Sequence, residues 1–290
     1  MANLLVSDII KMAEKQLHDA GIDEAKQQAE QIYCLMKNFD KMRFFMQWSK
    51  EAGEIEAENY FKLVAQRATH KPIQLIFGET EFMGYPFKVK ENVLIPRMDT
   101  EVVVEEAEKI AQNKDSVLDL CCGSGIIGIA LMKKAAENKK TLKVTSSDMS
   151  EEAVALTAEN AQLNGVRLEI TQGNLFEPIK KKKYDLIVSN PPYIESDVIP
   201  TLDVEVKDYD PLTALDGGED GLDFYKRIID EAPEHLKKKG RIIFEIGHNQ
   251  GTAVAELLKA SGAFEDIEIT KDLAGHDRAV KAYLAGKKKK

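Results

Sequence analysis

The chain has 290 residues, of which 43% are hydrophobic and 31% charged, with a formal net charge of −9 at pH 7. These values are typical of a globular protein with one large or two modest domains, and they disfavour a general nucleic-acid binder, which needs a basic face. No apolar run approaches the roughly 20 residues that cross a bilayer, and the amino terminus lacks signal-peptide features, so we expect a cytoplasmic protein without membrane contact.

The first 72 residues have a helical hydrophobic pattern throughout. Ser7 is predicted to cap a helix that ends at Gly21, and three further helices are expected before His70, one of them after Asp40. Four short amphipathic helices can bury their apolar stripes only against one another, which predicts a small bundle over residues 1–72. Its aromatic and Met positions are interpreted as core, with recognition of a partner as the alternative.

Residues 73–96 have a different period. Glycines and prolines separate two short β-like pieces, Gln74–Phe77 and Phe87–Val89, which predicts a hairpin-like connector. A helix is expected next, capped by Asp99 or Thr100. Arg97, just before this helix, is a candidate substrate-facing cation, and a solvated loop arginine is the alternative.

From residue 97 to residue 286, strand patterns alternate with helix patterns, as in a parallel sheet with crossover helices. Five strands are expected first: Ser116–Leu120, Lys143–Asp148, Leu168–Gln172, Tyr184–Ser189 and Arg241–Gly247. The last two, about Phe264–Thr270 and Ala279–Leu284, have too short a connection for a helical crossover and should be antiparallel. The predicted fold class is α/β, a Rossmann-like sheet of seven strands with an antiparallel last hairpin and an N-terminal helical bundle.

The first strand ends in a glycine-rich turn, and a helix follows it. Glycines at such a turn let a ligand approach the backbone, and the helix amino end offers free N–H groups. The turn consists of Cys121, Cys122, Gly123, Ser124 and Gly125. Asp148 closes the second strand near the spacing at which a carboxylate meets ribose hydroxyls. Its alternative role is a helix N-cap, which Ser150 serves better.

The third strand ends at Asn174, Leu175 and Phe176. Asn174 is a candidate to hydrogen-bond an adenine edge while Leu175 or Phe176 packs on the ring. The three cysteines form neither a disulfide framework nor a zinc-ligand spacing, so no metal is expected. Cys121 and Cys122 are interpreted as small packing residues rather than nucleophiles.

The fourth strand ends in Asn190, Pro191, Pro192 and Tyr193. The side-chain carbonyl of Asn190 and the main-chain carbonyl of Pro191 are two neighbouring acceptors, and neither proline nitrogen carries a competing proton. Two acceptors suit one planar NH2 group, whose π-face they would aim at an electrophile, and Tyr193 offers an aromatic surface. A merely rigid turn is the alternative. The long acidic loop Glu195–Asp220 that follows is expected to be functional or disordered.

Several stretches together resemble the class I S-adenosylmethionine-dependent methyltransferases, and more closely the peptide-chain release factor glutamine N5-methyltransferases. They are Lys71–Gln74 with Gly78, Glu81–Phe87, Ile95–Arg97 with Asp99–Glu101, Asp119–Gly125, Val188–Ile194 and Gly275–Arg278. The Asn190–Tyr193 motif is shared with nucleic-acid amino-methyltransferases, whereas the connector and Ile95–Arg97 single out this family. Cys121 stands where the family commonly has glycine, and His276, to which no role is assigned, replaces a common arginine.

The resemblance implies that a methyl group moves from S-adenosylmethionine to the side-chain amide nitrogen (N5) of the glutamine in the Gly-Gly-Gln motif of peptide chain release factors. It implies catalytic roles for Asn190, Pro191 and Tyr193, with Pro192 and Arg97 added for substrate binding. The implied cofactor-binding residues are Asp119, Cys121, Cys122, Gly123, Ser124, Gly125, Asp148, Asn174, Leu175 and Asn190. The bundle would dock the protein substrate, 97–286 would be the methyltransferase domain, and 287–290 a disordered lysine tail.

Three alternatives remain open at this stage. An adenine N6 amino-methyltransferase would use the same acceptor pair and an extruded base, but the acidic loop and net charge disfavour it, so no direct nucleic-acid substrate is expected. A nicotinamide-dependent oxidoreductase would leave Asn190–Tyr193 without a role. A non-catalytic translation-factor binding module would use the helical bundle alone.

Overall fold

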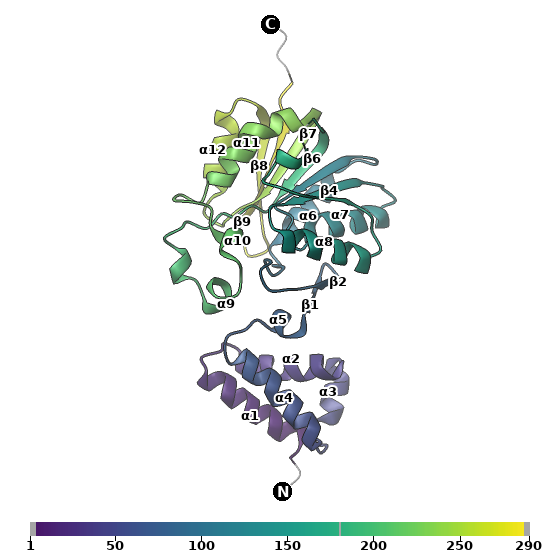
Figure 1. Cartoon of the computed structure of the whole chain (residues 1–290), viewed down its shortest axis with the longest axis vertical. Helices are drawn as coiled ribbons and strands as arrows, with labels where there is room; N and C mark the ends of the chain where they lie inside the picture. The colour runs from purple at the N-terminus through teal and green to yellow at the C-terminus, as the bar shows by residue number, and fades with distance from the viewer. Residues whose placement is uncertain (1–3, 180, 287–290) are drawn as a thin grey trace. The chain divides into compact units, whose positions relative to one another are not determined.

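The computed structural model describes residues 4–179 and 181–286, and the predicted lysine tail lies outside this range. The chain divides into two compact units between Gly78 and Glu79, a point inside the predicted connector. Figure 1 shows the helices of the first unit and the sheet of the second. No helix in the described part of the chain combines the length and apolarity needed to cross a membrane.

The first unit is a helical bundle, as the hydrophobic pattern predicts. Its helices are α1 (Val6–Asp19), α2 (Ala25–Lys37), α3 (Lys41–Gln47), α4 (Glu54–Arg67) and α5 (Ile73–Phe77). Tyr33 and Tyr60 pack edge to face in its core with ring centroids 5.6 Å apart. Asp40 caps α3 by accepting the Arg43 N–H at 2.7 Å. Ser7 is not the cap of α1, because the helix begins one residue before it.

Residues Gln74–Phe77 form helix α5 rather than the expected β-like piece. Pro72 precedes the helix, and its carbonyl accepts from the Leu75 and Ile76 N–H groups. Gly78 ends it in a left-handed conformation with φ of 72°. Proline before a first turn and glycine after the last favour a single helical turn, which outweighs the β propensity of the isoleucines and Phe77.

The hairpin of the connector lies just beyond, at the start of the second unit. Strands β1 (Glu79–Phe82) and β2 (Tyr85–Lys88) pair antiparallel through a two-residue turn. Met83 and Gly84 in this turn have φ of 52° and 80°. Two positive φ values are required by a tight hairpin turn that matches strand twist. Phe82 and Phe87 are thereby brought edge to face, and both are buried.

The second unit is built on a seven-stranded sheet in the order β5-β4-β3-β6-β7-β9-β8. The strands are β3 (Ser116–Leu120), β4 (Lys143–Asp148), β5 (Glu169–Gln172), β6 (Tyr184–Ser189), β7 (Leu236–Glu245), β8 (Phe264–Lys271) and β9 (Asp277–Leu284). Strands β3 to β7 are parallel, and β9 pairs antiparallel with both β7 and β8. The predicted fold class and the antiparallel last hairpin are confirmed.

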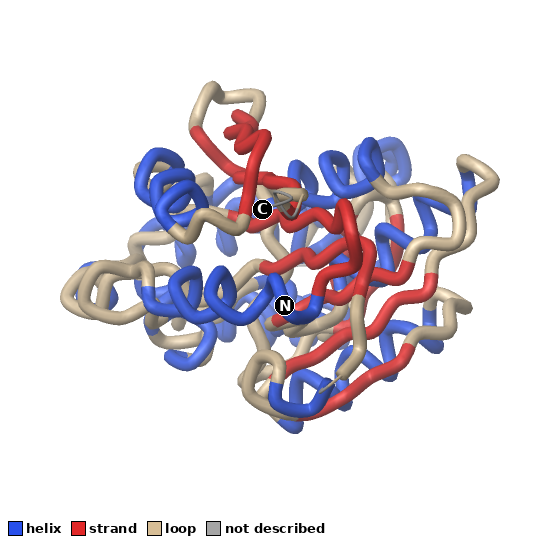
Figure 2. Tube along the Cα trace, turned by 90° about the horizontal axis from the view of Figure 1, so that it is seen from above, coloured by secondary structure: helices blue, strands red, loops and turns tan. Residues whose placement is uncertain are grey.

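Helices cover both faces of this sheet (Figures 1 and 2). Helices α6 (Thr100–Ile110), α7 (Ile126–Glu137) and α8 (Glu151–Leu163) lie on one face, and α11 (Asp223–His235) and α12 (Gly251–Ala260) lie on the other. Alternate strand residues supply the two cores, as Val117 and Leu118 do, because neighbouring strand side chains point to opposite faces. The topology reverses between β3 and β6, where a ligand crevice opens in such sheets.

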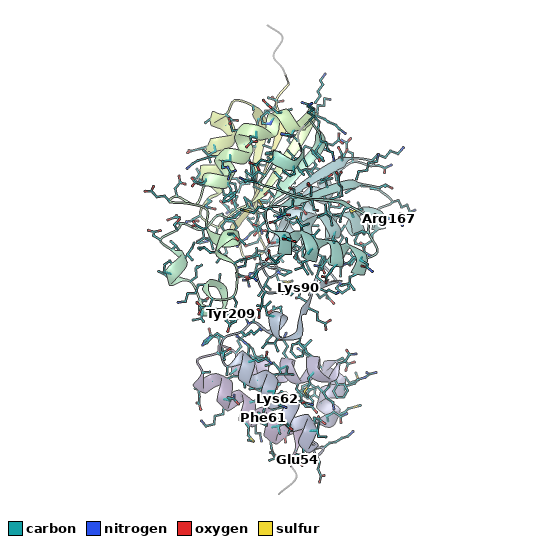
Figure 3. The ribbon with its side chains drawn as sticks, in the orientation of Figure 1. Glu54, Phe61, Lys62, Lys90, Arg167 and Tyr209 are labelled. Atoms are coloured by element: carbon teal, nitrogen blue, oxygen red, sulfur yellow. The ribbon has the colours of Figure 1, made fainter. Side chains whose placement is uncertain are left out.

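The expected long loop after Tyr193 has structure of its own. It contains the 3-10 helix Ile199–Thr201 and the one-turn helices α9 (Val204–Lys207) and α10 (Leu212–Leu215). A further 3-10 helix, Glu177–Ile179, follows β5. Tyr209, labelled in Figure 3, is the second residue after α9. The segment is held by Ile194 pairing with Asp216, so its two ends meet.

A buried ion pair fixes the amino-terminal edge of the sheet. Arg241 of β7 contacts the Asp115 carboxylate at 2.5 Å, and both side chains are about nine-tenths buried. The same guanidinium donates to the carbonyls of Ile110 and Asp185 at 2.9 and 3.1 Å. Removing one member of such a network leaves a charge buried and unpaired.

Replacing Arg241 with alanine should therefore lower the free energy of unfolding by ~3–5 kcal/mol, measured by urea denaturation. Lys226→Ala is the matched control, since Lys226 makes an ion pair with Asp220 at 2.7 Å but about half of each side chain is exposed. Its effect should stay below ~1 kcal/mol. Equal losses in the two variants would contradict a structural role for the buried network.

Candidate active site

A cavity with about 900 Å³ of empty space, partly open to solvent, lies at the carboxyl ends of the parallel strands. It is lined by seven stretches of the sequence, which lie within residues 92–100, 121–127, 147–153, 173–175, 190–192 and 211–214 and at Phe224. Of the predicted site residues, those on its wall are Arg97, Cys121, Cys122, Gly123, Ser124, Asp148, Asn174, Leu175, Asn190 and Pro192. Asp119, Gly125, Pro191 and Tyr193 do not line it. The strand order thus brings most of the predicted site together.

The turn after β3 forms the floor of this cavity. Cys121 has a φ of 58°, a left-handed conformation that glycine adopts more readily. Gly125 has a φ of 81°, and a Cβ there would lie 2.8 Å from Thr157 Cγ2. A Cβ at Gly123 would meet no atom within 4 Å, so the backbone is bare toward open space. Burial raises the pKa of both the Cys121 and Cys122 thiols, which disfavours a nucleophilic role.

Asp119 lies beneath the turn rather than on the cavity wall. Its Oδ2 accepts from the Gly128 N–H at 3.1 Å and from Ser146 Oγ at 3.2 Å, and the residue is fully buried. Burial raises the pKa of this carboxyl to about 7, and the two hydrogen bonds offset only part of that rise. Asp119 therefore ties the start of α7 to β3 and β4 and shapes the turn from below.

Asp148 reaches the cavity from the end of β4. Its Oδ2 accepts the Gly123 N–H at 2.9 Å and its Oδ1 accepts the Ser150 N–H at 3.0 Å. Burial raises its pKa, opposed by these backbone donors. Ser150 caps α8 through the Ala153 N–H at 3.1 Å, which leaves Asp148 free of that task. Each carboxylate oxygen retains a second acceptor site for a ligand.

Asn174 and Leu175 come from the segment after β5. Asn174 Oδ1 accepts from Arg227 Nη2 at 2.9 Å, and the Arg227 guanidinium lies over the Phe224 ring at 5.5 Å. The side-chain NH2 of Asn174 remains as a donor. Leu175 is buried and Phe224 is half-buried on the same wall. This side of the cavity combines apolar contact with one amide donor.

Asn190 lies on the opposite side, at the end of β6. Ser189 Oγ donates to the Leu120 carbonyl at 2.8 Å, which ties the end of β6 to the end of β3. The carbonyl of Tyr193 accepts from Gln250 Nε2 at 2.9 Å, so the turn is held at both ends. The Tyr193 side chain packs against the core on the α11 side, and burial raises its pKa.

Arg97 is held in place by a buried carboxylate. It pairs with Asp210 of the segment after α9, whose side chain is fully buried. Asp210 also accepts the Ile95 N–H at 3.1 Å, and burial raises its pKa against the effect of Arg97. The pair fastens the loop after Tyr193 to the stretch before α6, and both segments contribute cavity-lining residues.

Three residues that the sequence patterns did not reveal form a cluster with Asn190 around one buried carboxylate. They are Thr100, Glu245 and Arg278, which come from α6, β7 and β9. Thr100 and Glu245 are each 1% exposed. The sequence contains one signal for this cluster, because Glu245 interrupts the otherwise apolar run Ile242–Ile246. A charged side chain in a buried strand costs free energy unless it is paired, so such a residue is a candidate for a functional role.

The raised pKa of Asp119 makes a testable statement about stability. The Asp119 carboxyl has a pKa of about 7 in the folded protein and the ordinary value of 3.8 in the unfolded chain. Its contribution to the free energy of unfolding is therefore fully present below pH 4 and is lost as the pH rises through 7. Asp119→Asn removes this loss, so between pH 5 and pH 8 its free energy of unfolding should gain ~3 kcal/mol relative to the wild type. Urea denaturation at both values checks it, and a difference independent of pH would contradict it.

Two known protein families match parts of this chain. The Methyltransferase small domain family matches residues 97–203, and the PrmC N-terminal domain family matches residues 8–78. The release factor glutamine methyltransferase of Geobacter sulfurreducens is 38% identical over 275 residues, 95% of each chain. That of Clostridium acetobutylicum is 41% identical over 262 residues, 88% of this chain and 89% of its own.

Among solved structures, a methyltransferase from Pyrococcus furiosus is similar with a TM-score of 0.52 and 17% identity, covering 70% of this chain and 89% of its own. A 16S rRNA methyltransferase from T. thermophilus, in complex with AdoMet and guanosine, has a TM-score of 0.50 and 15% identity, covering 71% and 50%. These two likenesses concern the fold. The curated relatives show that the chain belongs to the release factor glutamine methyltransferase family and is an S-adenosylmethionine-dependent methyltransferase.

Proposed function

We propose that this enzyme methylates the side-chain amide nitrogen of the glutamine in the Gly-Gly-Gln motif of a peptide chain release factor, and that Asn190 and Pro191 hold that amide. The observation that carries the proposal is the position of Asn190 on the wall of a cavity that also contains the glycine-rich turn. Membership in a family with this name supports the substrate. A reaction on a translation factor would take place in the cytoplasm.

The cavity wall fits the cofactor chemically. Gly123 leaves its backbone bare toward open space, and Asp148 offers acceptor sites of the kind that ribose hydroxyls need. Asn174 offers an amide donor, and Leu175 offers an apolar surface for a ring. These residues would hold S-adenosylmethionine, with Cys121, Cys122, Ser124 and Asn190 beside them and Asp119 and Gly125 shaping the turn. When bound, it supplies an activated methyl group.

The protein's own task is to position a weak nucleophile. An amide nitrogen reacts poorly because its lone pair is delocalised into the carbonyl. Asn190 Oδ1 and the Pro191 carbonyl would accept its two N–H groups, which fixes the NH2 plane and stabilises positive charge that grows on nitrogen. Pro192 and Tyr193 keep the turn rigid, and Arg97, held by Asp210, lies at the cavity wall as a cation for the substrate backbone.

The helical unit is proposed to contact the release factor. Helix α3 exposes Met42, Phe45 and Met46 to between 60% and 75%, although such side chains are costly to leave in water. They lie on a helix whose opposite side buries Phe44. A flexible, Met-rich apolar surface is typical of protein recognition.

The direct test is incubation of the enzyme with S-adenosylmethionine and a purified release factor, followed by mass spectrometry of the glutamine-containing peptide. One added methyl group on the glutamine is expected. A variant release factor with the glutamine replaced by alanine is the control. Label that enters nucleic acid and not the protein would favour the nucleobase alternative and overturn the proposal.

Asn190 can be tested with an isosteric change. Asn190→Asp keeps the side-chain shape but replaces the NH2 group with a second carboxylate oxygen beside Glu245. Repulsion between the two carboxylates should turn the acceptor oxygen away from the substrate amide, so kcat should fall at least ~100-fold, or about 3 kcal/mol. Binding of S-adenosylmethionine, measured by calorimetry, should change far less. The proposed role of Asn190 would be wrong if kcat stayed within threefold of the wild type.

A further inference from the structure

A buried polar cluster lies directly under the Asn190 turn. Ser189 pairs with Phe244 across β6 and β7, so Asn190 and Glu245 are the next neighbours at the ends of two parallel strands. Glu245 also pairs with Ala279 of β9, which places Arg278 alongside. Thr100 at the start of α6 completes the cluster, and its side chain acts on the same carboxylate. Three elements therefore converge on one buried glutamate.

This cluster is unusual in its unpaired polar atoms. Among the described residues, six buried side-chain atoms lack a hydrogen-bond partner, and three of them are Thr100 Oγ1, Glu245 Oε2 and Arg278 Nε. Buried polar atoms in native proteins nearly always have partners. Half of the exceptions thus gather at one point next to the proposed acceptor of the substrate amide. The Glu245 main chain is satisfied, since its carbonyl accepts from the Tyr225 hydroxyl at 2.8 Å.

The surroundings of Glu245 place its pKa near neutral pH, so its protonated and ionised forms are both accessible there. Burial raises its pKa to about 7, while Thr100, Arg278 and Asn190 act to lower it and Asp99 acts to raise it. Arg278 is shared, because its Nη2 lies 3.2 Å from both Asp99 and Asp272. The hydroxyls of two tyrosines complete the surroundings, Tyr193 from the turn itself and Tyr225 from α11.

We propose that Glu245 is the positioning residue for Asn190: its buried Oε2 accepts from Asn190 Nδ2 and so turns Asn190 Oδ1 toward the cavity. This inference rests on the proposed function of Asn190. An ionised carboxylate only accepts hydrogen bonds, so the neighbouring amide must present its NH2 to it. Glu245 is 1% exposed and does not line the cavity, so its proposed action on the substrate runs through Asn190.

Asn190 needs this hydrogen bond because the oxygen and the NH2 group of an asparagine amide have nearly the same shape. Without a fixed neighbour, the side chain can rotate by 180° and present NH2 to the incoming amide, which places two donors face to face. A protonated Glu245 would favour that wrong orientation, because its O–H can donate to Oδ1. Ionisation of Glu245 therefore selects the productive orientation, and its otherwise unpaired Oε2 is available to accept the Asn190 NH2.

The test combines kinetics with a double-variant cycle. In the wild type, kcat should rise with pH with an apparent pKa near 7. Glu245→Gln should lose that rise and lower kcat about 10-fold at pH 8, with KM for the release factor and affinity for S-adenosylmethionine within threefold of the wild type. In an Asn190→Ala background the same change should have no further effect, because its target is gone.

Two controls distinguish the role of Glu245 from an effect of Asp119 and from a failure of the proposed substrate. Asp119 also has a pKa raised to about 7, so Asp119→Asn shows whether the pH dependence comes from beneath the cofactor turn instead. A second readout needs no turnover: the side-chain NH2 resonances of Asn190, assigned by their loss in Asn190→Ala, should shift with a midpoint near pH 7 in the wild type and not in Glu245→Gln. This readout stands even if the release factor is not methylated.

The proposal is overturned if Glu245→Gln retains the wild-type pH profile and kcat, or if Asp119→Asn alone abolishes the acidic limb. It is also overturned if the kcat losses of Asn190→Ala and Glu245→Gln multiply in the double variant. The proposal is likewise overturned if the Asn190 resonances do not shift between pH 5.5 and 8.5. Absence of methylation in the wild type together with a titrating Asn190 would overturn the proposed substrate and leave the positioning contact supported.

Discussion

The site depends on the parallel pairing of β3 with β6. Leu120 and Ser189 are partners in that pairing, and the Ser189 hydroxyl donates to the Leu120 carbonyl at 2.8 Å. The chain leaves both strands at the same edge, so the glycine-rich turn and the Asn190 turn meet although some 65 residues separate them. A slip of one residue in this register would move Asn190 to the other face of the sheet. The buried alternation of both strands prevents such a slip.

Buried carboxylates surround this edge and are held by fixed donors. Asp148 is held by backbone N–H groups, Asp210 by Ile95 and Arg97, and Asp119 by Gly128 and Ser146. Burial raises the pKa of each. Each group thus carries a cost in stability that the fold tolerates where it surrounds the cavity.

Much of this arrangement could be predicted from the sequence because its signals are local. The alternation of strand and helix patterns predicted the sheet, and the glycines after the first predicted strand predicted the turn that lines the cavity. The α5 turn was missed because two residues outside it, Pro72 and Gly78, decide its conformation. Glu245 was missed because its meaning depends on its neighbours on β6 and β9, which are set by sheet order and register rather than by sequence spacing. Long-range pairing is the information that local patterns lack.

The acceptor pair alone cannot choose the substrate. A glutamine amide and an adenine amino group are both planar NH2 groups with the same two donors, so Asn190 and Pro191 would satisfy either. Discrimination must therefore come from groups that meet the rest of the substrate. We propose that the Arg97–Asp210 pair at the cavity wall and the exposed apolar side chains of α3 contact a polypeptide substrate. In this proposal, two carbonyls at a sheet edge set the chemistry, and the choice of partner is left to surfaces that can change without disturbing them.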